Sequence, residues 1–276
     1  MEIQLWKELL DPYEQAVSEL LLKFRNMKEE YRKHNQYSPI ESVSGRVKTV
    51  SSILEKMLKK GITFEQLEEE VEDIAGVRII CQFVEDIERI AGMIDRRTDM
   101  EVRSRKDYLS NQKKSGYRSF HMIIWYTVQT MQGPKKLQAE IQIRTMAMNF
   151  WATTEHSLQY KYKGSIPEHV ESQLTRASEA IQILDREMSQ VRSEIMDAQI
   201  DSQIETSLVQ DILRNIENLY RLDNKREVVK IQNEFYRIFS QHNLDELARF
   251  GKQLDIMAEG SRAQSVESSI SGRVPD

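Results

Sequence analysis

The segment 136–144 constrains the fold most strongly, because its side chains alternate strictly between apolar and polar types. Successive side chains of a β-strand point to opposite faces of a sheet. The odd-numbered residues 137–143 would therefore face a core, and the even-numbered residues 138–144 would face away from it. The segment 117–128 is also predicted as a strand, with Ser119 and His121 on one face. If that face meets Glu140 and Gln142, a carboxylate, an amide and an imidazole share one cleft.

The first 163 residues are predicted to form an α+β domain that includes N-terminal helices. Helical spacing of apolar residues indicates long helices, whereas short β-branched runs indicate strands. The predicted sheet is mixed and mostly antiparallel, has about five strands and is flanked by helices. Helices are expected at residues 2–33, 46–60 and 85–97, and strands at 74–83, 100–108, 117–128 and 136–144.

The part of the chain after residue 145 is predicted to be helical throughout. Residues 164–204 would form a long helix with a heptad seam, residues 205–258 a further helical extension, and the Ser-rich residues 259–276 a disordered tail. The seam could lie on its own domain or pair helices between subunits, and its length of more than three heptads favours pairing. Its members are Val170, Leu174, Ala177, Ile181, Leu184, Met188, Val191 and Ile195.

The charge pattern excludes a general nucleic-acid coat, because the formal net charge is −5. Residues 44–60 and 101–121 are nevertheless basic, which indicates a focused anion site. The single cysteine, Cys81, excludes a disulfide framework and is expected to be buried. We find neither a signal peptide nor an apolar run of about 20 residues that could span a bilayer. A soluble cytoplasmic protein is expected.

The predicted helix 46–60 carries a basic stripe. At 100° per residue, Lys48, Ser52, Lys56 and Lys59 share one side and apolar residues the other. Arg46 would stand at the N-terminal end, where free N–H groups favour anions. The stripe is consistent either with an ordinary solvated lysine face or with a phosphate-binding surface.

Asp73 and Arg78 border the predicted strand 74–83. A carboxylate at a strand entrance can ligate Mg²⁺ while the metal keeps water and phosphate ligands. Arg78 alternates with its apolar neighbours, so it can stack on a base or pair with phosphate. The alternatives are a turn aspartate and a surface arginine.

The segment around Tyr117 has aromatic and basic character. An exposed ring can stack on a base, although ordinary packing is an equal alternative. His121 could be structural or could contact phosphate. The polar loop 109–116, with Lys113 and Lys114, suits a lid over phosphates. On the helix that follows residue 145, Asn149 can read a base edge.

Six segments together resemble the small alarmone synthetases, the stand-alone relatives of the RelA/SpoT enzymes. They are residues 38–41, 45–48, 73–78, 116–121, 140–145 and 149–156, and they occur in family order. The resemblance covers roughly residues 1–200. It implies a synthetase fold related to nucleotidyltransferases, and transfer of the β,γ-pyrophosphate of ATP to the 3′-hydroxyl of GDP or GTP, which yields AMP and (p)ppGpp.

The resemblance also implies roles for individual residues. Asp73 and Glu140 match the Mg²⁺-binding carboxylates, and Glu140 with Gln142 would orient the attacking hydroxyl. The implied ATP-binding set is Arg46, Lys48, Ser52, Lys56, Lys59, Arg78 and Arg105. The implied GDP- or GTP-binding set is Lys113, Lys114, Tyr117, His121, Arg144 and Asn149. A homo-oligomer, with a tetramer favoured, is implied as well.

Two features depart from the wider family pattern. No His-Asp pair of the hydrolase type occurs in the sequence, so synthesis without hydrolysis is expected. Ser42 stands where tetrameric relatives carry an aromatic residue of an allosteric site.

Two alternatives to this function stay open. The acceptor could be an adenine nucleotide or the 3′ end of a transfer RNA, or the chain could be an oligomer that binds single-stranded RNA.

Overall fold

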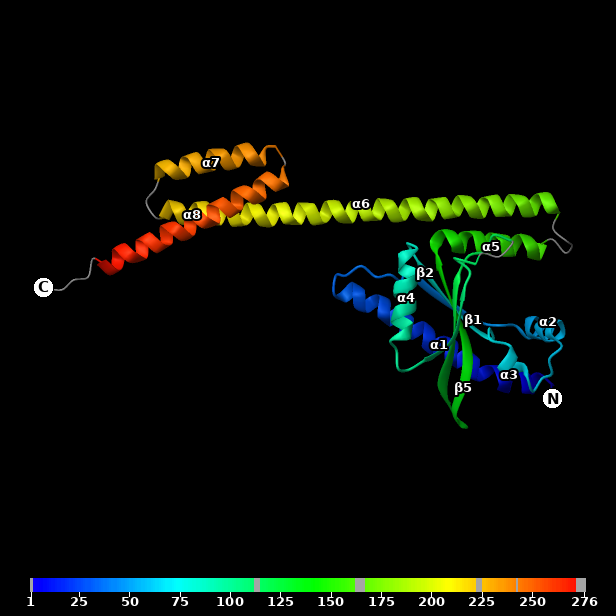
Figure 1. The fold of residues 1–276 in the computed structure, drawn as a ribbon. Helices are drawn as coiled ribbons and strands as arrows, with labels where there is room; N and C mark the ends of the chain where they lie inside the picture. Colours follow the sequence, from blue (N-terminus) through cyan, green and yellow to red (C-terminus); the bar gives the residue numbers. More distant parts are fainter. Residues whose placement is uncertain (1, 112–114, 162–166, 222–224, 242, 272–276) are drawn as a thin grey trace. The chain divides into compact units, whose positions relative to one another are not determined.

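The computed structural model describes all residues except 1, 112–114, 162–166, 222–224, 242 and 272–276. The first part of the chain contains a five-stranded sheet with the strand order β1-β2-β5-β4-β3 (Figure 1). Strands β2 and β5 are parallel and all other neighbours are antiparallel, so the predicted mixed, mostly antiparallel sheet is confirmed. The strands are β1 (Ser42–Val47), β2 (Ala75–Cys81), β3 (Glu101–Asp107), β4 (Phe120–Thr130) and β5 (Gly133–Thr145).

One face of the sheet is covered by helices. Helix α1 (Glu2–Lys33) contacts β1, β2, β4 and β5 and buries Tyr13, Leu20 and Phe24 at helical spacing. The odd-numbered residues 137–143 of β5 lie in the same core, as the alternation predicts. The remaining helices of this part are α2 (Val50–Lys60), α3 (Leu67–Glu70), α4 (Glu85–Asp95) and α5 (Met146–Lys161).

The predicted helix 46–60 is wrong at its N-terminal end. Residues 42–47 form edge strand β1, in which Arg46 pairs with Gly76 of β2. The helix begins only after Thr49, whose hydroxyl accepts a hydrogen bond from the Ser52 backbone N–H. It ends at Gly61, which has the left-handed φ of 66°. Arg46 is therefore placed by a strand, and Lys48 by the connection between strand and helix.

The C-terminal helices also differ from expectation. Helix α6 (Glu168–Arg221) continues through residue 204, where a boundary was predicted, and α7 (Lys225–Phe239) and α8 (Leu244–Ser271) follow. The chain divides into two compact units, residues 1–191 and 192–276. Helix α8 extends to Ser271, within the residues 259–276 for which a disordered tail was predicted.

The second unit has a core of its own. It is built from the end of α6, from α7 and from α8, and its buried members are Ile212, Ile216, Leu219, Val228, Phe235, Ile238, Leu247, Leu254 and Ala258. In the described part of the chain, no helix is both long and apolar enough to cross a membrane.

Candidate active site

The polar face of the sheet borders a cavity of about 570 Å³ in the first unit. Register explains why distant residues meet there, since Arg78 of β2 and His121 of β4 both pair with Gln142 of β5. The cavity is lined by Arg46, Lys56, Asp73, Arg78, Tyr117, His121, Glu140, Gln142 and Arg144, all of which were predicted as site residues.

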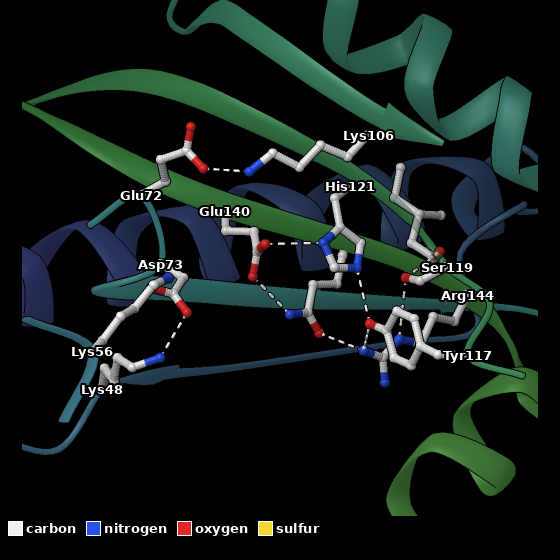
Figure 2. Close-up of polar contacts among 12 residues, drawn as sticks. Lys48, Lys56, Glu72, Asp73, Lys106, Tyr117, Ser119, His121, Glu140 and Arg144 are labelled. Carbon is white, nitrogen blue, oxygen red and sulfur yellow. Dashed lines mark hydrogen bonds and ion pairs between the residues drawn. The ribbon is translucent and has the colours of Figure 1, made fainter. Parts of the chain in front are cut away.

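Asp73 lies between two lysines at the entrance to β2 (Figure 2). The ammonium groups of Lys48 and Lys56 each lie 2.7 Å from a different oxygen of its carboxylate. Burial acts to raise the pKa of Asp73, but the two lysines outweigh it, so this pKa lies below that of an ordinary aspartate. Asp73 is therefore ionised at neutral pH.

Glu140 accepts hydrogen bonds at both carboxylate oxygens. His121 Nδ1 lies 2.9 Å from one oxygen, and the Gln142 amide donates to the other at 2.7 Å. Burial acts to raise the pKa of Glu140, but His121 and Gln142 outweigh it and the net shift is downward. The negative charge of Asp73 opposes that ionisation, so the two carboxylates are close enough to repel each other.

Five side chains, those of Glu140, His121, Tyr117, Arg144 and Gln142, form a hydrogen-bonded ring that fixes Glu140 in place (Figure 2). Arg144 donates to the Tyr117 hydroxyl and, at 2.9 Å, to the Gln142 side-chain oxygen. The Tyr117 hydroxyl lies 2.9 Å from His121 Nε2. With the His121 Nδ1 proton directed at Glu140, Tyr117 donates to His121. Two chains of donors thus start at Arg144 and converge on the Glu140 carboxylate.

A smaller cavity of about 160 Å³ lies beside β1 and β2 and is lined by Arg46, Gly76, Arg78 and Gln142, among others. Burial, followed by the charge of Arg144, lowers the pKa of the Arg78 guanidinium. Its Nε is buried without a hydrogen-bond partner among the described residues. Two guanidinium groups on adjacent strands offer flat, cationic surfaces to an aromatic ring.

Several predicted site residues do not line either of these cavities. Lys59 pairs with Glu55 on the exposed side of α2, and Ser52 takes part in the cap formed by Thr49. Asn149 has a buried side-chain oxygen without a partner among the described residues. Lys113 and Lys114 lie outside the described residues.

Arg105 lines neither of these cavities, and its assignment to the ATP site stays a prediction. Arg105 pairs with Asp95 of α4 at 2.6 Å, whereas its neighbour Lys106 lines the larger cavity and pairs with Glu72. Sequence reasoning also missed Tyr108, whose ring packs edge-on against those of Tyr117 and His121. From α5, Glu155 and His156 line the cavity at a spacing of one turn from Ala152.

Comparisons with known proteins agree with this geometry. Residues 45–165 match the family model described as a region found in RelA / SpoT proteins. The GTP pyrophosphokinase YjbM of Bacillus subtilis is 50% identical over 199 residues, which are 72% of this chain and 94% of that protein. YwaC, a GTP pyrophosphokinase of the same organism, is 38% identical over 69% of this chain and 91% of its own length.

A solved structure gives the same result. The crystal structure of small alarmone synthetase 1 from Bacillus subtilis, bound to its product pppGpp, matches with a TM-score of 0.68 and 50% identity. The match covers 70% of this chain and 98% of that one. The chain therefore belongs to the small alarmone synthetases of the RelA/SpoT family.

Proposed function

We propose that this protein transfers the β,γ-pyrophosphate of ATP to the 3′-hydroxyl of GDP or GTP. The observation that carries the proposal is that Asp73 and Glu140, 67 positions apart in the sequence, line one cavity together with several cations. Such a site can hold two polyanionic nucleotides side by side. The relatives named as GTP pyrophosphokinases and the pppGpp-bound neighbour support this choice of substrates.

The donor set fits Mg²⁺. This ion prefers hard oxygen ligands and is commonly held by one or two carboxylates together with substrate phosphates. Asp73 and Glu140 supply two carboxylates that line one cavity, and the pKa of each lies below its ordinary value, so both offer charged oxygen ligands at neutral pH. No larger cluster of metal-ligating side chains exists among the described residues. Bound Mg²⁺ would contribute neutralisation of charge on the phosphates.

The chain's own residues position the reactants. Arg46 and Arg78 would enclose the adenine ring, and Lys48, Lys56 and Lys106 would pair with donor phosphates. Tyr117 would stack on guanine. Glu140, held by Gln142 and His121, would accept the proton of the 3′-hydroxyl as its oxygen attacks the β-phosphorus. The bond from that phosphorus to the α,β-bridging oxygen breaks, and AMP leaves.

An acceptor screen tests this proposal. The protein is incubated with Mg²⁺, ATP labelled at the β-phosphate and one acceptor at a time, namely GDP, GTP, ADP or a transfer RNA. We expect AMP and a guanosine product that carries label at its 3′ position. Transfer to another acceptor alone would contradict the guanine specificity. Salt-sensitive RNA binding without turnover would favour the non-enzymatic alternative.

Helix α6 carries exposed apolar residues that could pair copies of the chain. On α6, the apolar residues Leu184, Met188 and Val191 are 51%, 46% and 45% exposed within one chain. We propose that this seam pairs copies of the chain into a homo-oligomer, for which the family resemblance favours a tetramer. Light scattering measures the size of this oligomer.

The reaction requires a compartment that supplies ATP and GTP, so we propose that the protein acts in the cytoplasm. We also propose that it synthesises (p)ppGpp without hydrolysing it.

A further inference from the structure

Two polar side chains of helix α6 are buried in the first unit. Ser178 and Asp185 are 2% and 5% exposed. They lie seven residues apart, so they share one side of the helix over two turns. Each bonds to a residue beside the active site, because Ser178 donates to the Gly116 carbonyl and Asp185 accepts a bond of 3.0 Å from Thr145. The proposed mechanism gives neither side chain a role.

The contact between Ser178 and Gly116 is unusually close. Gly116 has a φ of +88°, and a Cβ atom built on it would lie 2.7 Å from Ser178 Cβ. The same Cβ would lie 3.3 Å from the Trp151 ring of α5, and the Trp151 indole donates to the Leu174 carbonyl of α6 at 3.0 Å. The backbone at residue 116 is therefore held between two helices, where only glycine fits.

Gly116 directly precedes Tyr117, so the Gly116 peptide orients the backbone from which the Tyr117 ring extends. Glycine has more backbone freedom than any other residue, so its conformation must be set by contacts from outside. Beyond Gly116, the Tyr117 ring is held at its far end by hydrogen bonds of the hydroxyl with His121 and Arg144. Ser178 supplies the corresponding restraint at the backbone end.

We propose that Ser178 is a positioning residue for acceptor binding: its hydroxyl fixes the Gly116 peptide and thereby the plane of the Tyr117 ring that stacks on guanine. This inference rests on the proposed function. Without the hydroxyl, the buried Gly116 carbonyl loses this donor, and the peptide rotates to find another. The ring then no longer lies in the stacking plane, while the adenine side of the cavity keeps its geometry.

The test compares Ser178→Ala with Ser189→Ala in the full-length protein. The Ser189 hydroxyl donates to Glu85 of α4 at 3.0 Å, so this control weakens the attachment of α6 without touching residue 116. The dissociation constants of GDP and of α,β-methylene ATP are measured by calorimetry. We expect Ser178→Ala to weaken GDP binding about three- to tenfold, the range of one hydrogen bond. Binding of the ATP analogue should change less than twofold, and Ser189→Ala should leave both constants unchanged.

A second measurement shows whether the effect passes through the ring. In a Tyr117→Ala background, Ser178→Ala should no longer weaken GDP binding, because the ring that Ser178 positions is absent. Three outcomes would overturn this inference while leaving the proposed function intact. The first is an equal loss of GDP affinity in the Tyr117→Ala background, and the second is an equal loss of affinity for GDP and for the ATP analogue. The third is unchanged GDP affinity of a folded Ser178→Ala protein. If the wild-type protein bound no guanine nucleotide, the proposed function would fail as well.

Discussion

The two compact units bury different kinds of side chain. Every buried polar or charged residue in the described part of the chain lies in the first unit, and His121 and Arg144 are among them. The buried side chains of the helical second unit are apolar. Burying polar groups costs free energy unless they are fully hydrogen-bonded, so a fold retains them chiefly where they have a further use. The contrast indicates that binding and chemistry belong to the first unit, whereas the second unit's core serves stability.

If the first unit carries the chemistry, the largest effect on kcat should follow removal of one buried charge there. Glu140→Gln should lower kcat by about 10²–10⁴-fold, because the amide cannot accept the hydroxyl proton. The variant should still fold, because its amide oxygen can keep the hydrogen bond with His121, although the hydrogen bond from Gln142 is lost. Steady-state AMP formation gives the rate. Glu101→Gln is the control, because Glu101 is an exposed carboxylate of β3 that pairs with Lys136. A Glu140→Gln protein with a normal rate would refute the role of Glu140.

A cavity in the apolar core of the second unit should act on stability alone. Phe235 is 3% exposed, so Phe235→Ala should reduce the free energy of unfolding of that unit by about 3–5 kcal/mol. Urea unfolding followed by circular dichroism measures the loss. Tyr236→Ala is the matched control on the same helix, because Tyr236 is 63% exposed. Equal destabilisation by both variants would mean that this core is not packed as described.

The aromatic ring at the acceptor side provides a smaller and more selective test. Tyr117→Ala should weaken GDP binding by about 1–3 kcal/mol, the range measured for base stacking. Tyr117→Phe keeps the ring but loses the hydroxyl bonds with His121 and Arg144 that hold its far end, so it should lose less affinity than Tyr117→Ala. Calorimetric titration with GDP distinguishes the two variants. If the phenylalanine variant lost as much affinity as the alanine variant, the hydroxyl and not stacking would be responsible.

The smallest predicted effect concerns the pH dependence of stability. Burial raises the pKa of Asp185 above its ordinary value, so the folded state holds this proton more tightly than the unfolded state does. The contribution of Asp185 to stability therefore falls as pH rises from the ordinary aspartate pKa to the raised one. Asp185→Asn should remove this fall, which thermal unfolding between pH 3 and 7 would detect. The exposed control Asp211→Asn should keep the wild-type pH dependence.

The sequence alone predicted the parts of the site that depend on strict periodicity. Alternation along β5 correctly separated the core face from the face that carries Glu140 and Gln142. It could not choose between Arg105 and Lys106 on β3, because both faces of that strand carry basic residues. An irregularity of pairing between Val102 and Ser104 also shifts the register there. Strand β1 (Ser42–Val47) was missed entirely, and residues 46 and 47 were assigned to a helix, because a helical period can be continued backward across a short edge strand.

The ion pairs at the entrance of β2 reduce the free energy that the lysines can contribute to nucleotide binding. Asp73 is neutralised by Lys48 and Lys56, and Glu72 by Lys106, before any nucleotide arrives. A triphosphate therefore exchanges one set of ionic partners for another instead of meeting bare positive charge. The net gain from each lysine is a difference between two attractions. The lysines therefore contribute little to the choice between nucleotides, which depends on the groups that contact the bases.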